Sequence, residues 1–368
     1  MKKLLKYLLI LTSLAIFMPG CAGKGVNETT PATTPAEETI PTETVETIQE
    51  TETTIATEPT APRLAKREAQ DPTEGVMPEF IYYVGPEREH KSLTKLFMQL
   101  QDNHVEKVIF VDEGTYDMFK EYKEAGVASP PDDVSSPDYF DYNVFLPVNT
   151  KLIGIGNVRL EFNPSADEIT YGESRTWSPL NILGECHIEN IEIYCKNGRY
   201  CIHDDSHNQY QGSTHYYKNV RTIYEYSDLD SQGRRLGFNN TIGNGIAQGT
   251  NFIFEDCYFE FKGSDKNSAF YTHESGNTPG PLSTLTFIDC TFKGGLANSR
   301  TVRLQNLATA DVRVITTFQD CDIEGGIYLT IYKETSAQHF DVTLINSGNP
   351  MQMIDDMANN RFPIKVYK

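Results

Sequence analysis

The sequence predicts an all-β solenoid, in which every turn of the chain adds the same strands to the same sheets. A short motif, Phe-x-Asp-Cys, recurs without gaps in residues 254–259, 287–292 and 318–323, and its cysteines lie 33 and 31 residues apart. Short β-rich runs alternate apolar with polar side chains and end in Gly, Asn, Asp or Ser. Helical periodicity is nearly absent from them. Such repetition at a fixed period is typical of a repeat fold.

Weaker copies extend the repeat toward the N-terminus, around Cys186 in residues 184–188 and in residues 218–220. At about 3.3 Å per residue, a turn of this length holds three short strands and one longer loop. This length favours a parallel β-helix over a propeller, whose four-stranded blades use longer periods. We expect the acidic residue before each cysteine to lie at a corner, while the cysteine points into ladders spaced by about 4.8 Å.

The first edge of a solenoid needs a cap. Ser92, followed by apolar residues at i, i+3, i+4 and i+7, predicts an amphipathic helix over residues 93–102. A strand at 107–111 and Gly-Thr-Tyr at 114–116 follow. This order, with Leu-Ile-Gly-Ile-Gly-Asn at 152–157, resembles the N-terminal cap and early coils of the pectin-lyase-like superfamily. The resemblance covers most of residues 80–345 and implies a right-handed parallel β-helix with a short N-terminal capping helix.

Residues 1–20 have the features of an export signal, with a basic start and an apolar run of 12 residues that is too short to span a bilayer comfortably. Met-Pro-Gly-Cys at 18–21 resembles the lipobox of bacterial lipoproteins, which implies that Cys21 becomes the lipidated first residue of the mature chain. The alternative is an ordinary cleaved signal followed by an incidental cysteine. We expect an exported protein that is lipid-anchored to the outer face of a bacterial cell membrane and projects through or along the cell wall.

Residues 21–75 are expected to form a disordered tether, and residues 76–368 the β-helix domain. Between positions 29 and 60, 24 of 32 residues are Thr, Pro or Glu. Such a segment buries too little apolar surface to offset its ordering entropy. Aromatic residues mark a similar boundary, because 38 of the 40 lie in residues 80–368. The length of 368 residues therefore predicts one folded domain rather than two.

The net charge of the chain is −19, of which residues 80–368 carry −14. A domain with this charge lacks the clustered Lys and Arg that nucleic acids require, so nucleic acid is not an expected partner. Neutral glycans are expected partners, as are acidic ones reached through a divalent cation or local arginines. Neither a phosphate loop nor a Gly-x-Ser-x-Gly elbow is present, which disfavours nucleotide and serine hydrolase chemistry.

Six cysteines follow Cys21, an even number that raises the question of disulfides in an exported protein. Cysteines at one repeat position stack in parallel, and such stacking rarely gives the near-perpendicular dihedral angle that a disulfide needs. We therefore interpret the repeat cysteines as small buried apolar residues. Cys195 and Cys201 flank a turn-like segment, and a local disulfide between them is left open.

The chemistry is expected from side chains outside the coil, and residues 200–207 concentrate them. His203, Asp204, Asp205 and His207 place two imidazoles and two carboxylates within five residues. Such a cluster suits either a metal site or an acid–base site. If a metal binds, Asp204, Asp205 and His207 are the candidate ligands, and calcium is one candidate cofactor.

A second pair, His273 and Glu274, is expected at about the same place in its own turn, because His203 and His273 follow their repeat cysteines by 17 and 16 residues. Arg303 lies one turn further along. We expect these side chains on one outer face, with the two histidines about 10 Å apart across two rungs. The alternative is that both histidines are polar residues at strand ends that bond to neighbouring turns.

Four further residues are candidates for substrate binding. Asn239 and Asn240 belong to the intervening turn, while Trp177 and Tyr210 offer aromatic faces on which sugars can stack. Long loops rich in Gly, Ser, Asn or Pro lie nearby, at residues 206–214, 227–237 and 275–283. A row of polar side chains beside such loops is one way for a β-helix to build a carbohydrate cleft.

The resemblance implies lyase or glycoside hydrolase chemistry on a polysaccharide. An inverting hydrolase needs two carboxyl groups about 6.5–9.5 Å apart, which Glu274 and one of the two aspartates could provide. Pectate lyases of this fold use calcium-binding acids and a basic residue, for which Arg303 or His273 is the candidate. The Asp pair, Gly-His-Gly and Arg-x-Lys pattern of polygalacturonases is absent. A non-catalytic adhesin or glycan-binding module is the alternative, and the scaffold alone does not decide between them.

Overall fold

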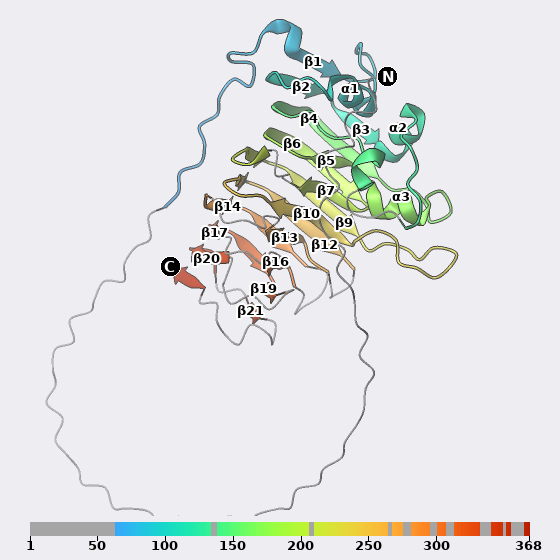
Figure 1. Ribbon diagram of the computed structural model, residues 1–368. Helices are drawn as coiled ribbons and strands as arrows, with labels where there is room; N and C mark the ends of the chain where they lie inside the picture. The colour runs from blue at the N-terminus through green and yellow to red at the C-terminus, as the bar shows by residue number, and fades with distance from the viewer. Residues whose placement is uncertain are drawn as a thin grey trace, which may run out of the picture. The chain divides into compact units, whose positions relative to one another are not determined.

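In the computed structural model, successive turns of the chain contribute strands to two parallel sheets that face one another across an apolar interior (Figure 1). The structure describes residues 63–133, 138–205, 210–263, 267–274, 281–294, 300–306, 313–331, 340–348, 351–354 and 364–368. Every pairing between these strands is parallel. The fold is a right-handed parallel β-helix, as predicted.

The smaller sheet, here called sheet B, takes one strand from each turn in sequence order. Its strands are β5 (Leu180–Ile182), β7 (Tyr200–Asp205), β10 (Asn240–Ile246), β13 (Phe270–Glu274), β16 (Val302–Asn306), β19 (Gly326–Ile331) and β21 (Met351–Ile354). Successive residues of each strand point alternately into the interior and out from the solenoid. This alternation decides which candidate residues are available to a ligand.

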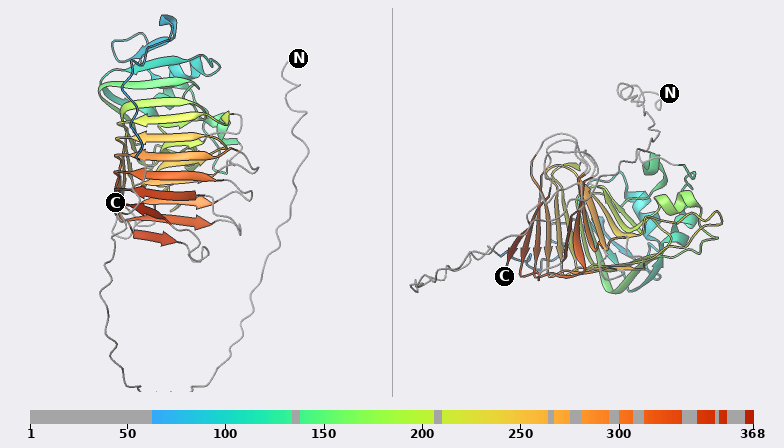
Figure 2. Two further views of the ribbon diagram at one scale, coloured as in Figure 1. Left: turned by 90° about the vertical axis from the view of Figure 1, so that its left-hand side faces the viewer. Right: turned by 90° about the horizontal axis from the view of Figure 1, so that it is seen from below.

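The larger sheet, sheet A, bends at a corner into two limbs. It begins with β1 (Ile81–Val84), β2 (Lys107–Val111), β3 (Gly114–Asp117), β4 (Thr150–Phe162) and β6 (Cys186–Cys195). One limb continues through β8 (Thr214–Lys218), β11 (Asn251–Glu255), β14 (Ser283–Ile288), β17 (Val314–Gln319), β20 (Phe340–Ile345) and β22 (Lys365–Tyr367). The other continues through β9 (Arg221–Glu225), β12 (Tyr258–Lys262), β15 (Thr291–Lys293) and β18 (Asp322–Glu324). Figure 2 shows these strands stacked turn upon turn.

The corner between the limbs is formed by one Asn or Asp per turn in the left-handed backbone region. Asp256, Asp289 and Asp320 have φ angles of 55°, 54° and 55°. Asn and Asp enter this region more readily than other residues with a side chain. The next residue points inward: Cys257, which is 2% exposed, and its counterparts are buried. The predicted acidic corner and inward cysteine are both confirmed.

The predicted copy of the repeat at Cys186 is wrong. Cys186 begins β6 and pairs with His215, whereas the corner of this turn is Asn190, with φ 59°, followed by buried Ile191. The copy predicted at residues 218–220 is confirmed, because Asn219 has φ 50° and Val220 is buried. The feature that the corners of successive turns share is therefore their backbone conformation. Cysteine is one of several small or apolar residues that fill the position after the corner.

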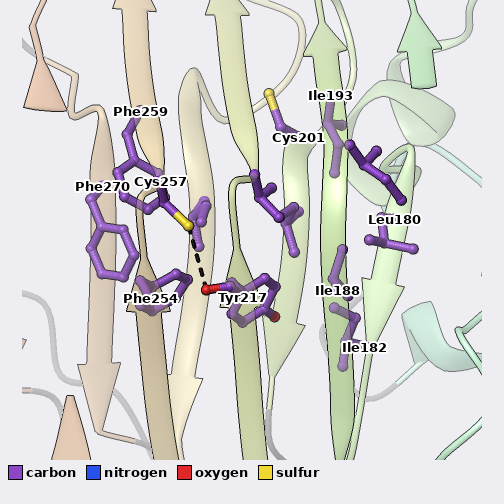
Figure 3. Packing of buried hydrophobic residues seen from close by; sticks show 14 of the residues in the cluster. Leu180, Ile182, Ile188, Ile193, Cys201, Tyr217, Phe254, Cys257, Phe259 and Phe270 are labelled. Atoms are coloured by element: carbon purple, nitrogen blue, oxygen red, sulfur yellow. Dashed lines mark hydrogen bonds between the residues drawn. The ribbon is translucent and has the colours of Figure 1, made fainter. Parts of the chain in front are cut away.

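Aromatic ladders fill the interior behind this corner. The rings of Tyr217, Phe254, Phe287 and Phe318 stack on successive turns, with centroids 4.6, 5.0 and 4.7 Å apart. These distances match the predicted rung spacing of about 4.8 Å. Figure 3 shows Phe254 beside Phe259 and Phe270, with the Cys257 thiol directed at the backbone oxygen of Tyr217. Ring stacking between turns adds to the burial of apolar area.

Helices gather at the N-terminal end of the solenoid (Figure 1). Helix α1 (Leu93–Leu100) begins after Ser92, whose side chain accepts a hydrogen bond from Lys95 N, and it buries Leu93, Leu96, Phe97 and Leu100. A helix was predicted here, and it ends two residues earlier than expected. Helices α2 (Met118–Ala125) and α3 (Tyr171–Thr176) follow, with 3₁₀ turns at Pro78–Phe80 and Asp138–Tyr142.

Residues 63–72, here called the N-terminal strap, lie along the outside of sheet A (blue in Figure 1). Arg63 pairs with Asp320, and Lys66 Nζ lies 2.7 Å from both Asp256 and Asp289. The strap thus places cations against three corner aspartates from consecutive turns. These residues fall within the segment expected to be a tether, whose remainder up to residue 62 lies outside the described residues.

All six cysteines after Cys21 are free and buried. Cys195 and Cys201 therefore form no disulfide, and the interpretation of the repeat cysteines as buried thiols is confirmed. Burial raises the pKa of the Cys201 and Cys290 thiols well above the ordinary value, so these groups stay protonated and unreactive. Among the described residues, none of the helices is long and apolar enough to cross a membrane.

Candidate functional site

The outer face of sheet B carries two rows of side chains that run across the turns. In the first row, Gly243 pairs with His203 and with Tyr271, and Tyr271 pairs with Arg303. In the second row, Gly245 pairs with Asp205 and with His273, and His273 pairs with Gln305. The two histidines thus share the predicted outer face, but the expectation that they occupy the same place in the coil is wrong, because they stand two residues apart in register.

Side chains from the two neighbouring strands cover both glycines of β10. A Cβ at Gly243 would collide with the ring of Tyr200, which therefore lies across the glycine. A Cβ at Gly245 would collide with Asp205 Oδ1 and would lie 3.3 Å from His273 Cε1. The Asp205 carboxylate on β7 and the His273 ring on β13 therefore approach one another over Gly245. Glycine inside a strand is typical of such close approach.

His273 is half-buried on this face, and a hydrogen bond orients its ring. Its Nδ1 lies 3.1 Å from the backbone oxygen of Glu274. A carbonyl oxygen can only accept, so Nδ1 carries the proton in the neutral ring and Nε2 keeps a lone pair. The Tyr271 ring lies 5.7 Å from the imidazole. This arrangement leaves Nε2 able to act as a base.

Unlike the half-buried His273, His203 is buried, with 4% of its surface exposed. Burial lowers the pKa of His203 well below its ordinary value, and the charges of Arg199 and His273 lower it further. The imidazole is therefore neutral near pH 7. Its Nε2 lies 4.0 Å from Asp205 Oδ2, and its ring lies 5.6 Å from that of Tyr200.

Arginines accompany three tyrosines on or beside this face. Arg199 lies over Tyr200, Arg303 over Tyr271 and Arg300 over Tyr328, at 5.6, 5.0 and 4.0 Å from the ring centroids. Across the strands of sheet B whose side chains the structure describes, Asp205 is the one carboxylate on the outer face. A domain with a strongly negative total charge therefore presents a locally cationic and aromatic surface here.

Two predicted catalytic acids are not on this surface. Asp204 and Glu274 alternate with the outward histidines and point into the interior, where they are 1% and 0% exposed. Strand neighbours lie on opposite faces, so an acid adjacent to an outward histidine must point inward. The predicted two-carboxylate hydrolase pair is therefore wrong, and Asp204 and Asp205 cannot share one calcium ion.

Inside the solenoid, Asp204 belongs to a polar cluster that sequence reasoning missed. His215 Nδ1 lies 2.9 and 3.0 Å from the two oxygens of Asp204, and the Tyr217 hydroxyl donates to the same carboxylate. His215 Nε2 lies 2.9 Å from Ser213 Oγ. Cys186 stands on the neighbouring rung, and its Sγ lies within 4.8 Å of the ligating atoms of Asp204 and His215.

The residues predicted to bind substrate have structural roles or lie elsewhere. Trp177 is fully buried, and its Nε1 donates to the Tyr142 backbone oxygen. Asn239 and Asn240 are buried and accept hydrogen bonds from backbone N–H groups of Ser227 and Ser268. In sheet B, Asn240 pairs with Tyr200.

Tyr210 lies away from these rows, with its ring 3.0 Å from where a Cβ of Gly184 would stand. His207 and Cys21 lie outside the described residues, as do parts of the loops at 206–214 and 275–283. The residues that sequence reasoning missed are Tyr200, Tyr271 and Gln305 on the outer face. The Gly-x-Gly pattern of β10 was the available signal for them.

A hollow lies on sheet A beneath the N-terminal strap. It has a volume of about 460 Å³ and is lined by Arg67, Lys151, His187, Tyr216 and Lys218, among others. Its cations face carboxylates: Lys151 lies 2.8 Å from Glu106, and Lys218 lies 3.9 Å from Glu189. Because its charges are compensated in this way, it suits an anionic ligand less well than the outer face of sheet B.

The chain matches no family model and no curated protein. Solved structures that resemble it include pectin methylesterases. The carrot enzyme has a TM-score of 0.36 and 11% identity, covering 82% of this chain and 90% of its own. The Aspergillus niger enzyme has a TM-score of 0.28 and 10% identity over 76% of each chain, and the Erwinia chrysanthemi enzyme 0.28 and 8% over 78% and 80%. Such low values carry no inference about the reaction, which depends on the site itself.

Proposed function

We propose that the outer face of sheet B binds an acidic polysaccharide and cleaves it by β-elimination, as a polysaccharide lyase. The observation that carries this proposal is the convergence of His273 and Asp205 over Gly245, on a face that holds arginines and only one carboxylate among its described strands. On the strands whose side chains are described, a two-carboxylate hydrolysis lacks its second acid. A base beside a cation is what β-elimination from a uronate requires.

The steps assign one task to each group. His273 Nε2 removes the proton on the carbon next to the uronate carboxylate. Arg303 pairs with that carboxylate and stabilises the charge that develops on it. The bond to the leaving glycosidic oxygen breaks, a carbon–carbon double bond forms in its place, and the oxygen takes a proton from solvent. Asp205, which approaches His273 over Gly245, lies near the positive charge that the imidazole gains in the transfer.

Tyr271 on β13 supplies an aromatic contact for a sugar. It is half-buried, whereas Tyr200 and Tyr328 are 5% and 6% exposed and lie beneath Arg199 and Arg300. The Tyr271 ring combines an apolar face with a polar tip, which suits a pyranose ring. Arginines beside these rings add attraction for a uronate on each side of the cleavage point.

The full-length chain should therefore release an unsaturated uronate from polyuronates, detected by its ultraviolet absorbance, and leave neutral glycans intact. His273→Gln should lower turnover by about 10²–10⁴-fold, as expected for loss of a general base. His187→Gln, on the outer face of sheet A, is the matched control and should leave turnover unchanged. Assays with and without calcium test whether a cation contributes.

The other outcomes separate the alternatives. New reducing ends without the absorbance would identify a hydrolase and contradict the elimination mechanism. Retention of polyuronates without any product would favour the non-catalytic adhesin or glycan-binding module. Wild-type turnover in His273→Gln would exclude His273 as the base.

We also propose that the protein is exported and anchored by a lipid on Cys21. The basic start, the short apolar run and the Cys at position 21 support this proposal. In a bacterial host, Cys21→Ser should move the chain from the membrane fraction to the soluble fraction and abolish incorporation of labelled fatty acid. Membrane retention equal to that of the wild type would contradict lipid anchoring.

A further inference from the structure

The cluster inside the solenoid places an imidazole in a row of apolar and uncharged side chains. His215 stands on the inner face of β8, where the next turns place Phe252 and Leu285 in the same row. Cys186 is its register partner on β6, and Asp204 reaches the same point from β7 in sheet B. Three donor types, a thiol, an imidazole and a carboxylate, therefore meet in the interior from two facing sheets.

The donor atoms are close enough to share one ion. The Cys186 Sγ, an Asp204 oxygen and a His215 nitrogen all lie within 4.8 Å of one another. Ligands at the usual zinc bond lengths of 2.0–2.3 Å in a tetrahedral arrangement stand about 3.3–3.6 Å apart. A contraction of about 1 Å in the widest pair therefore closes the site, while His215 and Asp204 need to separate by only a few tenths of an ångström from their present hydrogen bond.

The surrounding groups hold each ligand in the orientation that coordination requires. Ser213 Oγ lies 2.9 Å from His215 Nε2, so it can accept a hydrogen bond from Nε2–H, which leaves Nδ1 with a lone pair directed at Asp204. The Tyr217 hydroxyl donates a hydrogen bond to Asp204. Its oxygen is therefore positioned to serve as the fourth ligand atom. Partners of this kind, bonded to the distal side of a ligand, are a regular feature of zinc sites.

Charge balance points in the same direction. Cys186, Asp204 and His215 are 4%, 1% and 0% exposed, and an isolated charge is costly in such surroundings. A divalent cation with one thiolate, one carboxylate and two neutral ligands makes a cluster without net charge. Sulfur and nitrogen donors select zinc over calcium or magnesium, which prefer oxygen.

We propose that Cys186, Asp204 and His215, with Tyr217 as the fourth ligand, bind a structural zinc ion that ties sheet A to sheet B inside the solenoid. Binding releases the Cys186 thiol proton to solvent. The site is closed on all sides, so the ion enters as the chain folds. This site is independent of the proposed lyase face, because its carboxylate points to the opposite side of β7.

The test is the metal content of the full-length chain, purified from zinc-supplemented medium and dialysed against a chelator. We expect about one zinc per chain by elemental analysis, and a thiolate-to-metal charge-transfer band after unfolding and refolding with cobalt. Cys186→Ser should abolish the band and the bound zinc. Cys290→Ser removes a buried thiol from another row and should keep both. Ser213→Ala should weaken zinc affinity by about 10–100-fold.

The wild-type measurement alone decides the proposal, whatever the folding of the variants. Less than a tenth of an equivalent of zinc, with no cobalt band after refolding, would overturn it and leave a hydrogen-bonded polar cluster. Zinc retained fully in Cys186→Ser would place the ion elsewhere and also overturn it. Lyase activity has no part in these readouts.

Discussion

Replacing Lys66 with alanine should destabilise the solenoid in a salt-dependent way. Lys66 Nζ lies 2.7 Å from both Asp256 and Asp289, and the side chains are 40–42% exposed. Half-exposed pairs of this kind contribute about 0.2–1 kcal/mol each. Removing the lysine also uncovers repulsion between two aspartates one rung apart, about 1 kcal/mol in water. The expected loss is about 1–2 kcal/mol, or a Tm lower by about 2–4 °C.

Thermal unfolding of four chains provides the assay: wild type, Lys66→Ala, Asp289→Asn and the double variant. Asparagine keeps the corner backbone, since Asn219 and Asn346 occupy the same ladder, and it removes one charge. We expect the double variant to recover about half of the loss, and all differences to shrink in 1 M salt, where the Debye length is about 3 Å. Equal losses at low and high salt would refute the electrostatic reasoning and assign the effect to the packing of the lysine stem.

Three further predictions concern the proposed site, the core and pH. Gly245→Ala should lower turnover on polyuronates by about 100-fold through displacement of Asp205 and His273, while the unfolding midpoint stays unchanged; full activity would contradict the proposed site. Phe287→Ala should cost about 3–5 kcal/mol in denaturant unfolding, because its ring is buried between those of the turns above and below. Since burial holds the pKa of His203 below 6.5, the unfolded chain binds a proton that the folded chain excludes. Stability should therefore fall as pH drops below about 6.5, and this dependence should weaken in His203→Gln, as measured by urea unfolding.

The fold was predictable because its defining signals are local and repeated. The Phe-x-Asp-Cys copies mark the same corner in three turns, and their spacing determines the length of a turn. The copy at Cys186 was misplaced because cysteine identity was aligned. The Asn190-Ile191 pair, which has the backbone-permissive residue and an apolar follower but no cysteine, is the true equivalent.

The candidate site was predictable only in part. His203, Asp205, His273 and Arg303 do share an outer face, since all lie on strands of one sheet. Their acidic neighbours were misassigned, because adjacent residues of a strand point to opposite sides. Alternation alone would have separated Asp204 from His203. It could not have shown that Asp204 meets His215, because that contact joins two sheets across the interior.

The corner ladder also determines where this chain can change in length. The connection across the corner is two residues long between β8 and β9, β11 and β12, β14 and β15, and β17 and β18. From β5 onward, the other connections range from the single residue between β18 and β19 to the 14 residues between β9 and β10. An inserted residue at the corner would push a side chain that resists positive φ into the left-handed position and shift every inward group outward. The loops that border sheet B are therefore where an inserted residue is tolerated best, so the surroundings of the proposed site can change in length while the corner keeps the strands in register.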